Sequence, residues 1–219
     1  MKPRQLQLDL PQWGGRRKGA GRPRTRAHPG LTRPGVPHLA RPELSRHNPV
    51  HVTQRVQPGV GYLRGYRRAQ IIQQALRAVR MRFGVRVVHY SIQGNHLHLL
   101  VEADDAGALG RGMQSLAIRI ARRLNALAGR SGGVFVDRYH AHALSSRRAV
   151  ANAVRYVLGN YRHHAKEHIP AGWRDSLSSA AFLQNAPDED APVTLPRTWL
   201  LRVGWKLEPP VRRPSGAEP

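Results

Sequence analysis

The hydrophobic residues between positions 50 and 164 change their spacing from one segment to the next, and this change limits the fold more than any other feature. Segments with alternating hydrophobic residues, typical of half-buried strands, are separated by segments with the three- and four-residue spacing of amphipathic helices. The pattern predicts seven elements in the order β-α-β-β-α-β-α. The strands are Val50–Val56, Val85–Ile92, His96–Glu102 and a broken fourth strand at Val134–Val136 and Tyr139–Leu144, and the helices are Arg67–Arg82, Ala108–Leu127 and Arg147–His164.

This order of elements is the split βαβ pattern of ferredoxin-like folds. We therefore expect an α+β domain with one central antiparallel sheet and two helices packed on one face. An extra C-terminal helix follows the fourth strand and carries a tyrosine, Tyr156. Gln93, Gly94 and Asn95 are the residues that a tight hairpin turn favours between the second and third strands. Ser145 or Ser146 can cap the last helix.

The two ends of the chain differ in composition from this region. Residues 1–50 hold 11 lysines or arginines, 8 prolines and 6 glycines, but only two acidic residues. Such a segment buries too little apolar surface to offset its chain entropy, so we expect residues 1–47 to be a disordered basic arm. The folded domain should span residues 48–168. Residues 169–219 are rich in proline but contain three tryptophans, so we expect this tail to dock in part.

Charge restricts the class of partner. The 219 residues include 36 lysines and arginines against 13 acids, a formal net charge of +23, which favours a polyanionic partner and most simply nucleic acid. The absence of cysteine excludes disulfides, thiolate zinc sites and a cysteine nucleophile. No apolar run approaches the roughly 18 residues of a membrane-spanning helix. We therefore expect a cytoplasmic, nucleoid-associated protein without membrane contact.

A short segment of the basic arm, Gly21-Arg-Pro-Arg24, resembles the core of an AT-hook. In that motif, extended Arg-Pro backbone enters a narrow A·T minor groove, whose negative potential attracts guanidinium groups. Arg22 and Arg24 are therefore candidate DNA contacts. A generic basic tail that binds phosphates without sequence preference is the alternative.

Two pairs of histidines occupy alternate positions of predicted strands, so both imidazoles of each pair lie on one face. The pairs are His96 with His98 and His140 with His142. Either pair could bind a divalent metal ion, and spacing alone does not separate them.

The last predicted helix adds a second constellation. Tyr156 and Asn160 are four residues apart and therefore lie on one face of that helix. A tyrosine hydroxyl beside a metal-held phosphate can act as a nucleophile, and an amide oxygen one turn away can complete the metal site. The alternative for Tyr156, taken alone, is an ordinary core tyrosine.

The segment Val88–Glu102 resembles the HUH motif of single-tyrosine transposases, in which two histidines flank one hydrophobic residue, here Leu97. Pro49–Thr53 resembles their first strand, Val134–His140 the segment before their fourth strand, and Arg155–Tyr161 the helix that carries their tyrosine. The resemblance covers residues 48–165, and its motifs follow in the same order. Within this superfamily, the REP-associated tyrosine transposases are the most similar branch.

The resemblance implies a transposase that acts as a metal-dependent endonuclease and strand transferase on single-stranded DNA, at DNA hairpins. His96 and His98 would bind Mg²⁺ or Mn²⁺, and Asn160 would be the third ligand. Tyr156 would attack the phosphorus and form a 5′-phosphotyrosine intermediate. Many relatives have glutamine where this chain has Asn160, so the shorter amide requires a small shift of the helix. Mobile relatives work as dimers, whereas branches with one copy per genome can act as monomers, so both a homodimer and a monomer stay open.

Several neighbouring residues allow more than one interpretation. Tyr161 is the rival nucleophile, but its position five residues after Tyr156 rotates it by about 140° around the helix. Glu102 is either a metal ligand or a solvated or DNA-facing acid. His140 and His142 either contact DNA or take a metal-binding or proton-transfer role.

Arginines on two predicted helices are candidate phosphate contacts that could line one DNA groove. They are Arg119, Arg122 and Arg123 on one helix, and Arg147, Arg148, Arg155 and Arg162 on the other. A solvated basic helix surface is the alternative for any one of them.

Two other functions of the whole protein stay open: a domesticated protein that binds DNA hairpins without transposition, and a basic RNA-binding protein.

Overall fold

The computed structural model describes residues 43–164, 170, 172–183 and 186–209. All of these lie within residues 35–219, one of the two units into which the chain divides. Apart from residues 43–47, the expected basic arm lies outside the described residues, and so do Arg22 and Arg24. The side chain of Arg162 is also outside the description. The boundaries of the arm, the domain and the tail stay predictions.

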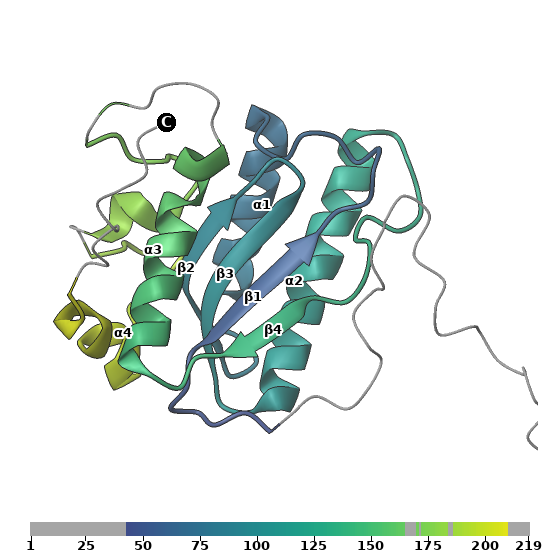
Figure 1. The fold of residues 1–219 in the computed structure, drawn as a ribbon. Helices are drawn as coiled ribbons and strands as arrows, with labels where there is room; N and C mark the ends of the chain where they lie inside the picture. The colour runs from purple at the N-terminus through teal and green to yellow at the C-terminus, as the bar shows by residue number, and fades with distance from the viewer. Residues whose placement is uncertain (1–42, 165–169, 171, 184–185, 210–219) are drawn as a thin grey trace, which may run out of the picture. The chain divides into compact units, whose positions relative to one another are not determined.

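Four antiparallel strands form one sheet in the order β2-β3-β1-β4 (Figure 1). β1 pairs with β3 on one side and with β4 on the other. This topology confirms the predicted α+β, ferredoxin-like arrangement. The strands are β1 (Val50–Arg55), β2 (Val85–Ile92), β3 (His96–Ala103) and β4 (His140–Ala143).

Two helices, α1 (Tyr66–Val79) and α2 (Ala106–Leu127), cover one face of the sheet (Figure 1). Both helices bury residues at three- and four-residue spacing against the apolar side chains of β1, β2 and β3. α2 approaches β2 closely at Gly112, where an added Cβ would lie 2.6 Å from a methyl carbon of Val85. The main core therefore lies between this helix pair and the sheet.

A third helix, α3 (Arg147–His164), follows β4 and packs on the opposite face of the sheet (Figure 1). Its Val150, Val154 and Val157 form a second apolar cluster with Val88 of β2 and Leu100 of β3. The hydroxyl of Ser146 accepts a hydrogen bond from the backbone N–H of Ala149 at 3.1 Å and caps the helix, as expected. The sheet thus has helices on both sides, and α3 packs mainly on β2 and β3.

The fourth strand is shorter than predicted. Only His140–Ala143 form a strand, while Phe135 makes an isolated bridge with Val56. Between them, the carboxylate of Asp137 accepts a hydrogen bond from the backbone N–H of Arg138 at 2.7 Å. A side chain that binds local backbone in this way competes with the strand ladder, and the regular strand begins only after it.

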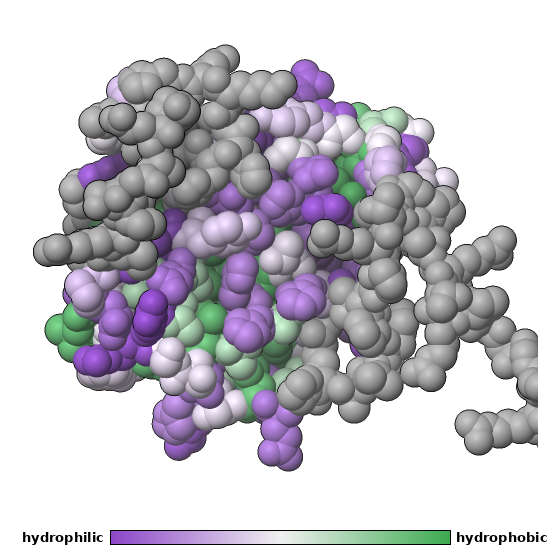
Figure 2. All heavy atoms as spheres, viewed as in Figure 1, coloured by the Kyte–Doolittle hydropathy of each residue, from purple (hydrophilic) through white to green (hydrophobic). Residues whose placement is uncertain are grey.

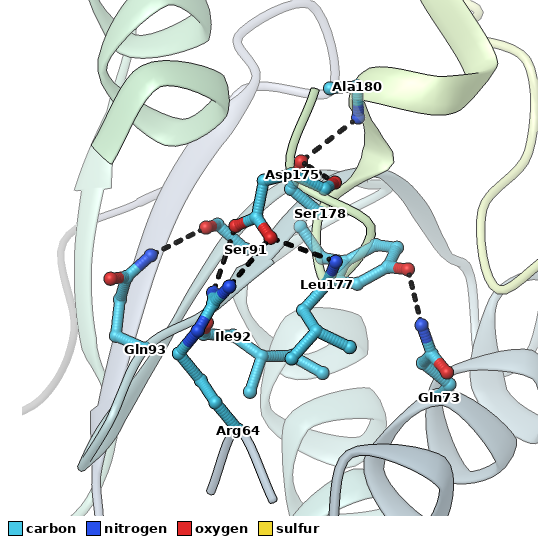
Figure 3. A network of polar contacts seen from close by, with 10 residues as sticks. Arg64, Gln73, Ser91, Ile92, Gln93, Asp175, Leu177, Ser178 and Ala180 are labelled. Carbon is cyan, nitrogen blue, oxygen red and sulfur yellow. Dashed lines mark hydrogen bonds and ion pairs between the residues drawn. The ribbon is translucent and has the colours of Figure 1, made fainter. Parts of the chain in front are cut away.

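Part of the described segment after α3 runs along the outer edge of the sheet, beside β2. Ile92 donates its backbone N–H to the carbonyl of Leu177, and Thr194 donates to the carbonyl of Val87, both at 2.9 Å. Asp175 accepts two hydrogen bonds from Arg64, at 2.8 and 2.9 Å (Figure 3). This segment occupies backbone groups of an edge strand that would otherwise be open to pairing with another chain.

Candidate active site

The face of the sheet that α1 and α2 leave open carries most of the polar side chains of interest. Leu97, Leu99 and Val101 of β3 point into the main core, so the alternate residues of that strand point the other way. Figure 2 shows this face with hydrophilic side chains over the strands beside α3 and hydrophobic residues visible between them. His96 and His98 lie on this face together with Tyr156 from α3.

The two histidines of β3 face each other through their Nε2 atoms, which are 3.0 Å apart. Their Nδ1 atoms are held by neighbours. Nδ1 of His96 lies 2.8 Å from the amide oxygen of Asn95, and Nδ1 of His98 lies 3.1 Å from Nε2 of His51 and 3.2 Å from the hydroxyl of Thr53. An amide oxygen only accepts, so the Asn95 contact requires a proton on Nδ1 of His96 and leaves a lone pair on its Nε2.

This arrangement fits a divalent metal ion. When His98 carries its proton on Nδ1, where Nε2 of His51 can accept it, two lone pairs lie 3.0 Å apart and repel unless a proton or a cation lies between them. Two ligand atoms at right angles, each about 2.1 Å from an octahedral ion, are about 3 Å apart, which matches the spacing of the two Nε2 atoms. The Nδ1 contacts to Asn95, His51 and Thr53 are the type of outer hydrogen bond that orients metal-binding imidazoles.

The hydroxyl of Tyr156 lies 3.5 Å from Nε2 of His98, and the two rings meet edge to face with centroids 5.0 Å apart. The side chain is 43% exposed. A core tyrosine would be buried, so the alternative interpretation of Tyr156 is wrong. Its hydroxyl lies beside the histidine pair on a surface that a substrate can reach.

Asn160 lies one turn beyond Tyr156 on the same face of α3. Its side chain is 0% exposed, and neither the amide oxygen nor the amide nitrogen has a hydrogen-bond partner among the described residues. Buried polar groups are nearly always paired, and an unpaired one costs roughly 1–3 kcal/mol. The amide is therefore a buried polar group without a partner among the described residues, one turn from the tyrosine that lies beside the histidine pair.

Further along α3, Tyr161 belongs to a different environment. The guanidinium of Arg64 lies 3.7 Å from the centre of its ring, and the ring of Trp173 packs against it at 5.5 Å. Arg64 also donates a hydrogen bond to the carbonyl of Ile92, the last residue of β2. Because α3 packs on Leu100 and then reaches Arg64 through Tyr161, the helix runs from Leu100 towards the β2–β3 hairpin. Asn160 therefore lies between the Tyr156 level and the hairpin, where His96 begins β3.

Two imidazoles and an amide oxygen are donors that divalent metals accept. Within the described part of the chain, no group of three or more histidine, cysteine, aspartate or glutamate side chains could hold a metal ion. A site built from His96, His98 and Asn160 therefore depends on the amide as its third protein ligand.

Sequence reasoning missed His51 and Thr53. Both lie on β1, whose register places Thr53 directly opposite His98. Burial lowers the pKa of His51 from 6.5 to about 4, and the positive charges of His142 and His140 act in the same direction. His51 is therefore neutral at neutral pH and can accept a hydrogen bond. The sequence did contain a signal for these two residues, because every second position of the first strand is polar.

The second histidine pair lies on the other side of β1. His140 and His142 on β4 are exposed and pair in register with Thr53 and His51. They share the open face with the first pair but are separated from it by a strand. Their contact with DNA, or a metal-binding or proton-transfer role, stays a prediction.

The candidate DNA-binding arginines do not line a single groove, which corrects the expectation from the sequence. α2 and α3 lie on opposite faces of the sheet (Figure 1). Two arginines of α3 also contact the C-terminal segment: Arg155 donates to the carbonyls of Glu208 and Pro209, and Arg147 lies 3.2 Å from the carboxylate of Glu208. DNA contact stays a prediction for each residue: Arg119, Arg122, Arg123, Arg147, Arg148, Arg155 and Arg162.

Glu102 is neither a metal ligand nor a DNA-facing acid. Its buried carboxylate accepts hydrogen bonds from the backbone N–H groups of Arg197 and Thr198 and from the hydroxyl of Thr198, at 2.7–3.0 Å. Thr198 in turn caps the short helix α4 (Trp199–Arg202). The acid at the end of β3 therefore holds the C-terminal segment.

The family model for IS200-like transposases matches residues 50–160, which is more than half of the 219-residue chain. The chain belongs to the IS200-like transposase family. The matched span starts at β1 and ends at Asn160, so it contains His96, His98 and Tyr156. Because this family consists of transposases, the protein is a DNA-processing enzyme.

A comparison with solved structures found two transposases that are similar to this chain. A REP-associated tyrosine transposase bound to a REP hairpin is 14% identical, with a TM-score of 0.52 over 67% of this chain and 84% of that chain. A candidate transposase from Deinococcus radiodurans R1 is 17% identical, with a TM-score of 0.39 over 57% of this chain and 95% of that one. The first likeness supports the fold.

A search of curated proteins found no match. Among the described helices, none is long and apolar enough to cross a membrane.

Proposed function

We propose that this IS200-like transposase is a metal-dependent endonuclease and strand transferase for single-stranded DNA, with Tyr156 as its nucleophile. One observation carries the proposal: the Tyr156 hydroxyl lies 3.5 Å from Nε2 of His98, which lies 3.0 Å from Nε2 of His96. A phosphate that approaches the two Nε2 atoms meets the hydroxyl at the same surface. The exposure of the tyrosine leaves room for the strand.

The reaction is a displacement at phosphorus. The Tyr156 oxygen forms a bond to the phosphorus, and the bond from the phosphorus to the 3′ oxygen breaks. The phenolic proton passes to solvent, and the departing 3′ oxygen takes up a proton, so the exchange is balanced. The products are a 5′-phosphotyrosine and a free 3′-OH. Because the new linkage is still a phosphodiester, a different 3′-OH can reverse the step and complete strand transfer without ATP.

His96 and His98 would hold Mg²⁺ or Mn²⁺ through Nε2, and Asn160 through its amide oxygen. A bound ion of this kind polarises the scissile phosphate and stabilises the charge that develops on its oxygens. Asn95 orients the first imidazole through Nδ1, and His51 orients the second in the same way. These residues keep the two Nε2 atoms directed at one point.

The hairpin bound to the REP-associated relative supports a DNA hairpin beside the cleavage site as the substrate. The excess of basic residues supports the same partner, because phosphate contacts dominate nucleic-acid affinity. We place the reaction on nucleoid DNA in the cytoplasm, and both a monomer and a homodimer stay open as the active assembly.

Covalent capture tests this function. The protein is incubated with labelled single-stranded hairpin oligonucleotides in Mn²⁺ or in EDTA, and adducts that resist denaturation are detected on a gel. We expect an adduct in Mn²⁺ that is absent in EDTA and absent in Tyr156→Phe. Tyr161→Phe is the matched control and should still form the adduct. An adduct that survives in Tyr156→Phe would refute the assignment of the nucleophile, and tight binding without any adduct would favour a domesticated hairpin-binding protein.

A further inference from the structure

Aromatic rings gather around Arg64 at the end of the sheet where β2 and β3 are joined. We call Tyr62, Tyr161 and Trp173 the aromatic patch. Tyr62 is 58% exposed and Trp173 39%. Single exposed aromatic side chains are normal on protein surfaces, but a cluster of them marks an interaction surface. The metal-binding and nucleophilic residues of the proposed reaction do not include any of them.

The aromatic patch adjoins the metal-binding strand. The ring of Tyr62 packs on Gly94 in the β2–β3 hairpin so closely that an added Cβ at Gly94 would lie 2.9 Å from a ring carbon. The backbone N–H of Leu63 also donates to the carbonyl of Gly94 at 2.8 Å. The next residue, Asn95, holds His96 through its side chain. A strand of nucleic acid that reaches the histidine pair from this end must therefore pass the aromatic patch.

The patch is held in place before any ligand binds. Arg64 donates two hydrogen bonds to Asp175 and one to the carbonyl of Ile92, at 2.7–2.9 Å (Figure 3). Its guanidinium covers the ring of Tyr161, which packs in turn against Trp173. Burial opposes the charge of Arg64, but the hydrogen bonds and the negative charge of Asp175 outweigh it and raise its pKa. Arg64 is thus engaged within the protein and serves to fix the rings.

Charge indicates what these rings bind. No acidic residue occurs between Glu43 and Glu102, so the segment that carries Tyr62 and Tyr66 is wholly basic or neutral. Arg67 and Arg68 follow directly in the first turn of α1. Exposed aromatic rings beside arginines form the type of surface on which unpaired bases stack while their phosphates meet cations.

We propose that the aromatic patch is a stacking platform for unpaired bases of the DNA strand that leads to Tyr156, with Tyr62 as its principal ring. The direction of the strand rests on the proposed function, whereas the stacking itself does not. Stacking on a ring is independent of base identity, because every base has an aromatic face. The platform therefore positions the strand, and sequence recognition belongs elsewhere.

Binding to dT20 with a 5′-fluorescein label, measured by fluorescence anisotropy in EDTA, tests the platform without cleavage. Tyr62→Leu should weaken binding by about tenfold. Its dependence on salt should match that of the wild type, because no phosphate contact is lost. Tyr62→Phe keeps the ring and should bind like the wild type. Phe83→Leu is the matched control, since Phe83 is an exposed ring beside Arg82 at the far end of β2.

A 20-nucleotide abasic strand, which keeps the phosphates but has no bases, separates stacking from electrostatic attraction. The wild type should prefer dT20 to the abasic strand, and Tyr62→Leu should lose most of that preference. Equal affinity of Tyr62→Leu and wild type for dT20 would overturn the proposal, as would an equal loss for both strands. Tighter binding of rU20 than of dT20 would overturn the assignment to DNA.

The covalent-capture assay distinguishes failure of this inference from failure of the proposed function. Adduct formation with unchanged dT20 affinity in Tyr62→Leu would refute the platform and leave the nuclease intact. If the wild type forms no adduct but Tyr62→Leu still loses affinity for dT20, the result would support the platform and refute the nuclease.

Discussion

The imidazoles of His51 and His98 stack with their centroids 5.2 Å apart, and Nε2 of His51 lies 3.1 Å from Nδ1 of His98. The two residues are 47 positions apart in the chain and meet because β1 pairs with β3. This contact fixes the ring of His98 so that its Nε2 faces both His96 and Tyr156. His51 is therefore a positioning residue for the candidate metal site.

Removal of this support should weaken metal binding. We expect His51→Ala to raise the Kd for Mn²⁺ by about 10- to 100-fold, as loss of an outer hydrogen bond to a metal-binding histidine does. His51→Gln can still accept the hydrogen bond and should restore most of the affinity. Isothermal titration calorimetry without DNA measures both. A larger loss in His142→Ala than in His51→Ala would instead assign the metal to the second histidine pair.

Replacement of Asn160 by leucine should stabilise the metal-free protein while it removes a metal ligand. The buried amide has no partner among the described residues, so Asn160→Leu should raise the free energy of unfolding in EDTA by about 1–2 kcal/mol. In saturating Mn²⁺, the wild type should gain stability that the variant lacks. Urea unfolding under both conditions provides the measurement.

Asn125→Leu is the control for this experiment. Its amide oxygen also has no partner among the described residues, but its amide nitrogen donates to the carbonyl of Gly132 at 2.9 Å, so its replacement loses a hydrogen bond and should destabilise the protein in EDTA. A loss of stability in Asn160→Leu comparable to that control would contradict the assignment of Asn160 as an unpaired group.

The carboxylate of Glu102 should contribute to stability through the C-terminal segment. We expect Glu102→Gln to lower the free energy of unfolding by about 2 kcal/mol, because hydrogen bonds to a charged acceptor are lost and an amide N–H group then faces backbone donors. Limited proteolysis should cut the segment around Arg197 faster. Glu189→Gln has the same change of charge at an exposed position and should leave both properties unchanged. Equal unfolding midpoints for the two variants would contradict this role.

Stability should fall in mild acid because of His89. Burial lowers the pKa of His89 from 6.5 to about 4, and its Nδ1 lies 3.1 Å from the hydroxyl of Ser179. Between these pH values the unfolded chain binds a proton that the folded chain does not. The stability present above pH 6.5 is therefore lost as the pH falls towards 4, by at most about 3 kcal/mol.

His89→Gln should flatten this pH dependence in urea unfolding measured from pH 4 to 7. The remaining slope should reflect His51, whose pKa is also lowered to about 4. Exposed His47 provides the control, and His47→Gln should keep the slope of the wild type. An unchanged slope in His89→Gln would show that its charge is not excluded by folding.

The local elements were predictable because their signals lie within a few neighbouring residues. Alternate positions of a strand share a face, so His96 and His98 could be paired from the sequence alone. Residues four apart share a helix face, which joined Tyr156 to Asn160. A break between Val136 and Tyr139 was also predicted, but the strand is shorter than expected, because the Asp137 side chain in this break binds local backbone.

Local patterns therefore predict the order of the elements, the ferredoxin-like class of fold and the four central candidate residues. The partners that surround these residues depend on how the elements pack together. His51 and Thr53 reach His98 through strand pairing, and Glu102 meets Thr198 across 96 positions. α2 and α3 lie on opposite faces of the sheet, which separates arginines that resemble one another in sequence. Periodicity records which face a residue takes within its own element, whereas contacts between elements depend on long-range packing that no local pattern contains.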